Sequence, residues 1–287
     1  MRRLAGRIVA YGRMIRFPHS VFALPFALAA AALAANQSGI TVRQLVWIVV
    51  AMVAARSAAM GFNRLVDHSI DARNPRTAGR ELPRGVLSRR EVLAFVALSS
   101  VVFVVAAGML NTLCLALSPV ALAIVFGYSY TKRVTSASHL VLGLALGVAP
   151  VGAWLAVRGR LEAAPLVLGL AVMLWVAGFD TLYACQDADF DRREGLHSLP
   201  ARLGVARALL LARGMHALAV LLLSWVFWLA PLHPLYLVGV GGVAALLTWE
   251  HSLVRAQDLS RVMHAFNLNG WVSLGYLVLT VAAAWLA

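Results

Sequence analysis

The chain has 287 residues, of which 61% are hydrophobic and only 13% are charged. Average soluble domains are about half apolar and about a quarter charged, so this composition excludes an ordinary soluble domain. Apolar stretches of about twenty residues, each long enough to cross a bilayer of roughly 30 Å, recur from end to end. We therefore expect residues 1–287 to form a single all-α, polytopic membrane domain in contact with the lipid bilayer.

Nine transmembrane helices are predicted from the apolar stretches. Their ranges, in chain order, are 17–36, 42–66, 91–109, 112–130, 138–158, 163–186, 205–230, 232–250 and 267–287. The basic region before the first helix and the length of that helix both exceed those of a signal peptide, so we expect no cleavage there. Short connections favour antiparallel packing of successive helices. We expect a bundle around a central cavity that opens to caps on the cytoplasmic side.

The basic residues are distributed unequally between the connections of these helices. If the helices alternate in direction, 21 of the 25 Lys and Arg residues fall on one side of the membrane and 3 on the other. Arg56 is the remaining one and lies inside the second helix. Because basic residues collect in cytoplasmic loops, the richer side is predicted to face the cytoplasm, as in a multi-pass inner-membrane protein. Topology thereby explains the formal charge of +13, and no nucleic-acid partner is expected.

Six of the seven aspartates fall in two clusters, near the ends of the second and sixth predicted helices. In the first cluster, Asn63, Asp67 and Asp71 are four residues apart and therefore share one face of a helix. In the second cluster, Asp187 and Asp191 repeat the same step. The two helices are four spans apart and point the same way, so both clusters are expected at the cytoplasmic surface. This pattern predicts an internal repeat that relates helices 1–4 to helices 5–8.

These acidic residues need a positive partner, because like charges at four-residue steps repel and ionisable groups inside a membrane are costly. Mg²⁺ takes hard oxygen ligands and commonly binds one or two carboxylates together with substrate phosphates. We predict that the two clusters hold Mg²⁺ and a diphosphate, with Asn63, Asp67, Asp71, Asp187 and Asp191 as the metal-binding residues. Ordinary ion pairs between these aspartates and neighbouring arginines are the alternative interpretation.

The two motifs resemble those of the UbiA superfamily of intramembrane prenyltransferases. Members carry an N-x-x-x-D-x-x-x-D motif after the second helix, matched here by residues 63–71, and a D-x-x-x-D motif after the sixth, matched by residues 187–191. The resemblance covers the whole chain. It implies Mg²⁺-dependent transfer of a polyprenyl group from polyprenyl diphosphate to an aromatic acid in the biosynthesis of a quinone, either ubiquinone or menaquinone.

Several segments carry a closer resemblance within this superfamily. Residues 180–184 are similar to a stretch found in members that prenylate hydroxybenzoate-like acids, and segments 62–67, 74–77 and 194–198 are similar to the 4-hydroxybenzoate polyprenyltransferase-like group. Some of that group are associated with a naphthoate, so the acceptor stays open between 4-hydroxybenzoate and 1,4-dihydroxy-6-naphthoate. His197 stands where many hydroxybenzoate enzymes have Lys. Diphosphate binding there is expected to be weaker, pH-dependent, or taken over by Arg192 and Arg193.

Arg56 lies on the same face as Asn63 and Asp67, about 10 Å deeper along the helix, where an isolated cation is costly. We predict that its guanidinium binds the carboxylate of the aromatic acceptor in a fork. The alternative is a structural ion pair with Asp180. Asp180 itself lies seven residues before Asp187 and is a candidate for polarising the acceptor hydroxyl or taking the ring proton.

Further residues near the cytoplasmic ends of the helices complete the predicted site. Tyr128, Tyr130 and Tyr183 are candidates for stabilising an allylic carbocation, although Tyr128 and Tyr130 also fit an aromatic belt at the membrane interface. We assign catalytic roles to Asp180, Asp191 and Tyr183. The other candidates are basic residues that bind substrate or, alternatively, only mark the cytoplasmic side: Arg16, Arg73, Lys132 and Arg192.

Three other features bear on packing and on the cap. The connection after the second helix holds Arg73, Arg76 and Arg80 and is long, so we expect it to cap the site. Small residues at Gly143, Gly147, Gly241 and Gly242 are predicted to lie where helices pack closely. Five other histidines show no spacing typical of metal ligands and receive no predicted role: His139, His216, His233, His251 and His264.

Two rival functions use similar residues. A CDP-lipid head-group transferase also uses membrane aspartates with Mg²⁺, but it concentrates them in one motif, whereas this chain divides them between two helices. A cation transporter would place carboxylates along a conduction path, whereas the acidic residues here gather at one face. The sequence therefore favours prenyl transfer.

Overall fold

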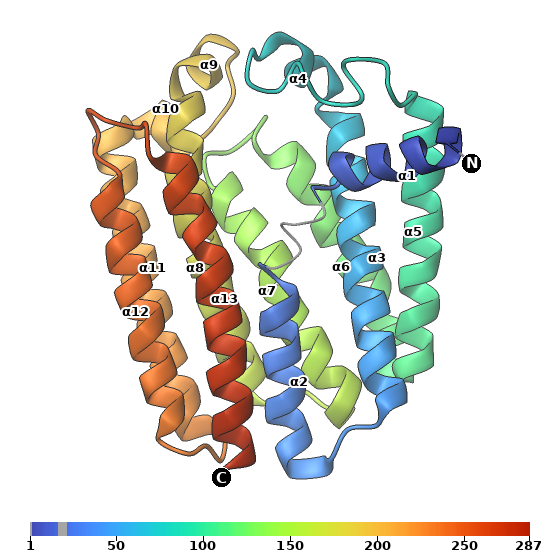
Figure 1. Cartoon of the computed structure of the whole chain (residues 1–287), viewed down its shortest axis with the longest axis vertical. Helices are drawn as coiled ribbons and strands as arrows, with labels where there is room; N and C mark the ends of the chain where they lie inside the picture. Colours follow the sequence, from blue (N-terminus) through green and yellow to red (C-terminus); the bar gives the residue numbers. More distant parts are fainter. Residues whose placement is uncertain (1, 17–21) are drawn as a thin grey trace. The chain divides into compact units, whose positions relative to one another are not determined.

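The computed structural model describes residues 2–16 and 22–287, and helices dominate this part of the chain (Figure 1). An isolated bridge between Arg255 and Asp258 is the only β interaction among the described residues. The α-helices are α1 (Arg2–Met14), α2 (Leu24–Ser38), α3 (Val42–Val66), α4 (His68–Arg73), α5 (Arg89–Leu110), α6 (Thr112–Thr131), α7 (Ser138–Arg158), α8 (Ala163–Ala184), α9 (Ala188–Arg193), α10 (Leu199–Leu203), α11 (Val205–Leu229), α12 (Leu235–Leu253) and α13 (Val262–Trp285). The predicted all-α class is confirmed.

The long helices coincide with the apolar stretches of the sequence. In the hydrocarbon of a bilayer no water can bond to the backbone, and a helix makes all its backbone hydrogen bonds within its own segment. Among the described residues, seven segments are long and apolar enough to cross a membrane, namely α3, α5, α6, α7, α8 with its continuation to Arg193, α11 and α13. Helix α2 is apolar but shorter, and α12 carries Glu250 and His251 in its last turn. The number of nine spans stays a prediction. The first predicted span begins at residue 17, and residues 17–21 lie outside the described part of the chain.

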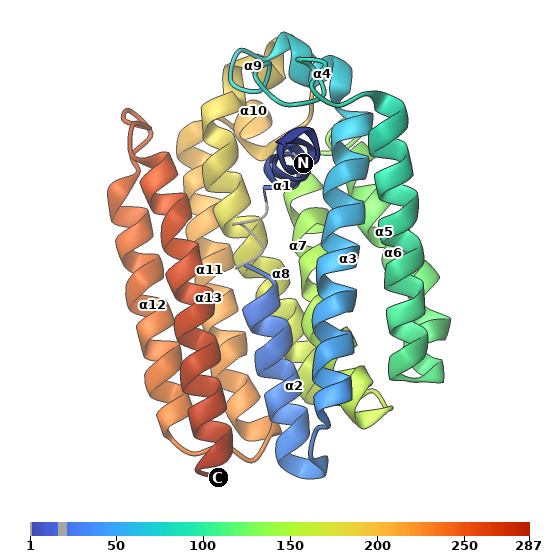
Figure 2. The ribbon, with the colours of Figure 1, turned by 45° about the vertical axis from the view of Figure 1, so that its right-hand side comes forward.

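The chain divides into two compact units, and the first consists of residues 1–20 and 46–130. Its core joins α1 to α3 and α5 through Ala10 and Met14 of α1, Met60 of α3, and Val92 of α5. Helix α1, which the hydropathy pattern did not predict, runs across the axes of α3 and α5 (Figure 1; Figure 2). Its Ile8 side chain is 65% exposed while Met14 is buried, so α1 has one apolar face inward and another available to lipid.

The second unit consists of residues 21–45 and 131–287. Helix α8 is its centre: it packs against α7 and α11, while α2 packs against α7 and α13, and α12 packs against α13. Accordingly, most of the α8 residues from Ala164 to Ala184 are buried. Whether the two units form the predicted single domain with an internal repeat stays a prediction.

Glycines allow α7 and α8 to approach closely. A Cβ atom on Gly143 would lie 2.1 Å from the carbonyl oxygen of Met173, and one on Gly147 would lie 2.5 Å from that of Gly169. The predicted close packing at Gly143 and Gly147 is confirmed. The prediction was wrong for Gly241 and Gly242, where an added Cβ would meet nothing within 4 Å, because their face of α12 does not contact another helix.

Charged residues in the second unit gather at one end. The segment α9–α10, the start of α7 and the α12–α13 connection lie together at that end, whereas the α7–α8 connection lies at the other (Figure 1; Figure 2). The first end holds Lys132, Arg133, Arg192, Arg193, Arg202, Arg255 and Arg261, and the other holds Arg158 and Arg160. Within this unit the charge asymmetry follows the predicted sidedness, and the cytoplasmic assignment stays a prediction.

Candidate functional site

The first acidic cluster lies where α3 ends and the short helix α4 begins. Asp67 interrupts the helix with φ −87° and ψ 4°. The four-residue hydrogen-bond step nevertheless continues, because the Asp67 N–H donates to the Asn63 carbonyl at 2.9 Å and the Asp71 N–H donates to the Asp67 carbonyl at 2.7 Å. The predicted alignment of these three residues therefore survives a break that the spacing did not predict.

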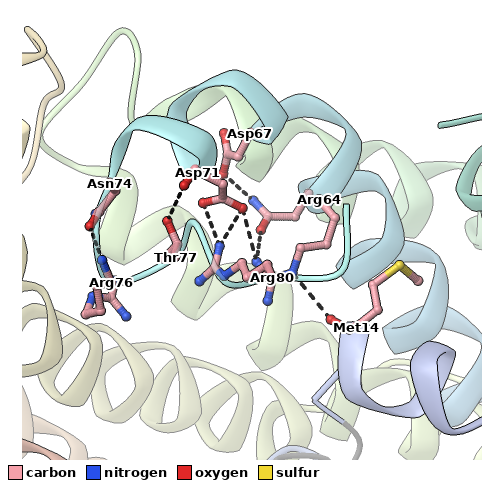
Figure 3. Close-up of polar contacts among 9 residues, drawn as sticks. Met14, Arg64, Asp67, Asp71, Asn74, Arg76, Thr77 and Arg80 are labelled. Atoms are coloured by element: carbon pink, nitrogen blue, oxygen red, sulfur yellow. Dashed lines mark hydrogen bonds and ion pairs between the residues drawn. The ribbon is translucent and has the colours of Figure 1, made fainter. Parts of the chain in front are cut away.

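A basic side chain from the long connection closes on Asp71. The Arg80 Nη1 atom lies 2.7 Å from both carboxylate oxygens of Asp71, whose residue is only 5% exposed (Figure 3). The Thr77 hydroxyl donates to the Asp71 carbonyl at 3.0 Å, and Arg64 Nη1 lies 4.0 Å from Asp71 Oδ2. A buried carboxylate needs such charge-assisted partners. The connection thus folds back over α4, and its role as a cap of the site stays a prediction.

Asn63 acts as a bridge within the first cluster. Its amide Nδ2 donates to Asp67 Oδ2 at 2.9 Å, and its Oδ1 accepts from Arg64 Nη1 at 3.3 Å. Arg64 also reaches the Met14 carbonyl at 3.3 Å, which ties α1 to the cluster (Figure 3). Asn63 is therefore a donor to a carboxylate in this structure, and it orients that carboxylate by a hydrogen bond.

The second acidic cluster has the same local construction. Helix α8 ends at Ala184, a 3-10 turn covers Cys185–Asp187, and the six-residue helix α9 follows. Asp187 has φ −102° and ψ 4°, close to the values at Asp67. Like Asp71 in α4, Asp191 lies four residues after this interruption and is buried. The backbone therefore takes the same local course at both clusters, and the internal repeat stays a prediction.

Asp191 is the more completely buried of the two paired aspartates. It is 0% exposed, and Lys132 Nζ lies 2.7 Å from its Oδ1 atom. Its Oδ2 atom has no hydrogen-bond partner among the described residues. Because a buried anionic oxygen without a partner costs free energy, this carboxylate has capacity for a further cation.

Mg²⁺ fits this donor set by its chemistry. The clusters offer carboxylate and amide oxygens, which are hard ligands, and Mg²⁺ usually completes its shell with water and substrate phosphates rather than with protein alone. In the described part of the chain, no group of three His, Cys, Asp or Glu side chains is close enough to hold a metal ion by itself. Buried Asp191, with an Oδ2 atom that has no hydrogen-bond partner among the described residues, offers a ligand of this kind.

Asp180 has a partner that the sequence reasoning missed. Its Oδ2 atom lies 2.6 Å from His139 Nδ1, and His139 Nε2 lies 3.3 Å from the backbone nitrogen of Leu199. Metal-ligand spacing gives no indication of His139, because its partner is a single carboxylate on another helix. The useful signal is position in the α7–α8 hairpin: the two residues lie almost equally far from its turn at Gly159, so antiparallel packing places them at one level.

The predicted acceptor-binding arginines lie together within the first unit. Arg56 Nη2 donates to the Arg16 carbonyl at 3.4 Å, and Arg56 Nε has no hydrogen-bond partner among the described residues. Arg16 has φ 47°, an unusual value for a residue other than glycine. An arginine with unused donors inside a predicted span has capacity for an anion.

The remaining candidates have diverse surroundings. The Tyr183 ring lies 4.8 Å from that of Phe266, and the exposed Tyr130 ring makes an edge contact with Phe62 at 6.0 Å. Tyr128 is half-buried and Arg73 is exposed. Arg192 is exposed and pairs with Asp189 at 2.9 Å, and His197 is exposed while its backbone N–H donates to the Lys132 carbonyl at 2.7 Å.

Comparison with known sequences gives a consistent result. The UbiA prenyltransferase family matches residues 23–286. A protein of Sodalis glossinidius named 4-hydroxybenzoate octaprenyltransferase is 34% identical over 221 residues, which cover 76% of this chain and 75% of the relative. A protein of the same name from Xanthomonas euvesicatoria pv. vesicatoria is 35% identical over 232 residues, covering 80% of this chain and 76% of the relative.

Solved structures share the same fold. The apo structure of a UbiA homolog from Aeropyrum pernix K1 has 36% sequence identity and a TM-score of 0.84, covering 92% of this chain and 98% of that one. A UbiA homolog from Archaeoglobus fulgidus bound to GPP and Mg²⁺ has 19% identity and a TM-score of 0.72, covering 96% and 100%. Because the family match spans nearly the whole chain, the protein belongs to the UbiA prenyltransferase family.

Proposed function

We propose that this chain transfers a polyprenyl group from its diphosphate to 4-hydroxybenzoate, or to a closely related aromatic acid, in a Mg²⁺-dependent step of quinone biosynthesis. The observation that carries the proposal is Asp191, a fully buried carboxylate in the second motif with Lys132 on one oxygen and no hydrogen-bond partner on the other. Relatives above 30% identity are named 4-hydroxybenzoate octaprenyltransferase, which supports the acceptor. Related structures bound to GPP with Mg²⁺ and to DMAPP with Mg²⁺ support the donor and the metal.

The proposed reaction exchanges one bond for another. The allylic C–O bond of the donor breaks, and diphosphate leaves with the electron pair. A C–C bond then forms at the aromatic ring, and the ring loses a proton to a base. Asn63, Asp67, Asp71, Asp187 and Asp191 would hold Mg²⁺, which would supply charge neutralisation for the departing diphosphate.

The chain's own side chains take the other roles in this proposal. Lys132, Arg192 and Arg73 are the basic residues proposed to bind diphosphate oxygens through charge-assisted hydrogen bonds. Tyr183, packed against Phe266 at 4.8 Å, helps to exclude water from the allylic cation and offers it an aromatic face. Tyr128 and Tyr130 are proposed to do the same at the end of α6.

The acceptor is proposed to bind through its carboxylate. Arg56 has an unused Nε donor and is held by the Arg16 carbonyl, so its guanidinium is available for a fork-shaped contact. Asp180 then accepts the proton released by the ring. We place the reaction at the cytoplasmic side of an inner membrane, because the basic residues favour that orientation.

Purified protein in lipid nanodiscs tests the proposal. With geranyl diphosphate, 4-hydroxybenzoate and Mg²⁺, we expect prenylated product and released diphosphate in equal amounts, and neither product when EDTA removes the metal. Replacing 4-hydroxybenzoate with 1,4-dihydroxy-6-naphthoate decides between the two acceptors. Release of CMP from a CDP-lipid, or metal flux in vesicles without turnover, would instead support one of the rival functions.

A matched pair of variants tests the acidic cluster. Asp191→Asn removes the buried charge, and we expect kcat to fall by about 100-fold or more, as for the loss of a principal electrostatic group. Asp189→Asn is the control, because this neighbour is exposed, with a side chain that is 86% accessible, and it pairs with the exposed Arg192. Activity of Asp191→Asn equal to that of Asp189→Asn would contradict the assignment.

A further inference from the structure

The contact between His139 and Asp180 has a defined direction. His139 is 4% exposed and lies in the first turn of α7, while Asp180 lies in the last two turns of α8. The backbone N–H of Leu199 can only donate, so His139 Nε2, at 3.3 Å, must accept. The imidazole proton is therefore on Nδ1, which donates to Asp180 Oδ2 at 2.6 Å. His139 is neutral and Asp180 is the acceptor.

The chain holds Leu199 firmly in this position. The Ser198 hydroxyl caps the helix that begins at Leu199 by accepting from the Ala201 N–H at 3.3 Å. His197, two residues before Leu199, is held by two further hydrogen bonds. Its N–H donates to the carbonyl of Lys132 in the α6–α7 connection at 2.7 Å, and its carbonyl accepts from the hydroxyl of Ser138, the first residue of α7, at 3.4 Å. The segment that follows the second acidic motif therefore fixes the tautomer of His139.

This arrangement suits a proton acceptor better than an ion pair would. A cationic partner strongly favours an ionised carboxylate and so reduces its tendency to take a proton, whereas a neutral donor orients the carboxylate with a smaller effect. The bond to His139 is made through Oδ2, and Oδ1 is not used by it and is available to take a proton. The Asp180 side chain is 24% exposed, so it is accessible while its partner is buried.

We propose that His139 is a positioning residue for Asp180, a role that rests on the proposed prenyl transfer. His139 holds the Asp180 carboxylate in one orientation and keeps Oδ1 available for the ring proton. The segment 197–199 sets the imidazole tautomer, in the way that an outer hydrogen bond fixes the tautomer of a catalytic or metal-bound histidine. Lys132 pairs with Asp191 through its ammonium group and accepts from the His197 N–H through its carbonyl, so the segment that fixes His139 is also attached to the second acidic motif.

Two amide substitutions separate this role from simple packing. The amide nitrogen of Asn falls near the position of imidazole Nδ1, whereas the amide of Gln reaches toward that of Nε2. His139→Asn therefore retains a donor for Asp180, and His139→Gln retains an acceptor for the Leu199 N–H. If His139 only ties helices together, Gln substitutes as well as Asn or better. If it positions Asp180, Asn preserves turnover and Gln does not.

The assay uses the full chain in nanodiscs with Mg²⁺, geranyl diphosphate and the accepted aromatic acid. We expect His139→Gln and His139→Leu to lower kcat by about 10²-fold, which is typical for disturbed general-base catalysis, with the donor KM within about twofold of wild type. The kcat of His139→Asn should be at least about tenfold higher than that of His139→Gln or His139→Leu. In an Asp180→Asn background, His139→Leu should cause no further loss, because both residues act in one step.

The possible failures are distinguishable. If the wild-type chain prenylates neither acceptor, the proposed function is wrong. If wild type is active but Asn and Gln lower kcat equally, or Gln is the better substitute, the positioning role is overturned. The exposed His264 provides the control, since its Asn and Gln variants should both match wild type. Thermal unfolding of each variant identifies any that fail to fold. If His139→Leu fails to fold, the comparison of His139→Asn with His139→Gln still decides the question.

Discussion

Gly143→Ala directly perturbs the contact between α7 and α8. An added Cβ would lie 2.1 Å from the Met173 carbonyl oxygen, whereas ordinary contact begins at 3.4 Å. The opposing atom belongs to the backbone, so it cannot rotate away as a side chain can. Relieving the overlap requires the two helices to separate locally by about 1 Å.

The consequence reaches Asp180 through His139. Gly143 lies four residues, about one helical turn, after His139 on the same face of α7. A local separation of about 1 Å would lengthen the 2.6 Å contact between His139 Nδ1 and Asp180 Oδ2 beyond the range of about 2.7–3.2 Å of a good hydrogen bond. Misplacement of that size can lower turnover by about 10²-fold.

The stability cost is estimated from overpacking. Inserting a methyl group into a well-packed contact costs about 1–3 kcal/mol, which corresponds to a fall in Tm of roughly 2–10 °C for a chain of this size. Gly152→Ala is the matched control in the same helix, because its added Cβ would meet nothing within 4 Å. In the helix interior, Ala is favoured over Gly by roughly 0.5–1 kcal/mol, so the control should keep or raise Tm.

The assay combines thermal unfolding in nanodiscs with kcat for prenyl transfer. We expect Gly143→Ala to lower both, and Gly152→Ala to lower neither. Equal Tm and kcat for the two variants would refute the close backbone contact between α7 and α8. A lower Tm with unchanged kcat would retain that contact but refute its connection to Asp180.

Two further predictions concern buried polar groups. Arg56→Ala should raise KM for the aromatic acid about tenfold or more, because a fork-shaped carboxylate contact is lost, while KM for the prenyl donor stays within about twofold. Steady-state kinetics with each substrate varied in turn will measure both KM values. Equal changes in the two values would contradict the prediction. Glu250 is 0% exposed, with Oε1 accepting from Asn269 at 2.8 Å and Oε2 lacking a hydrogen-bond partner among the described residues. Glu250→Gln should therefore keep or raise Tm. Glu250→Leu should lower the free energy of unfolding by about 1–3 kcal/mol, because it removes the acceptor of the Asn269 amide. A lower Tm for Glu250→Gln than for Glu250→Leu would contradict this prediction.

The sequence alone determined the features that depend on local spacing. Apolar stretches defined the long helices because every backbone hydrogen bond of a helix is made within the segment itself. Four-residue steps aligned Asn63 with Asp71 and Asp187 with Asp191, and the continued i to i−4 hydrogen bonds keep that alignment in the first cluster even where the helix is interrupted. The close approach of α7 to α8 at Gly143 was also readable, since small residues permit it.

Only the tertiary structure decided which side chains pair. Arg80 reaches Asp71 because the connection after α4 folds back. Lys132, which directly follows α6 in sequence, reaches Asp191 in α9. His139 meets Asp180 because two antiparallel helices pack at one particular rotation about their axes. Such contacts join residues distant in sequence, and their geometry depends on helix rotation and loop path. Periodicity within a single helix carries no information about either.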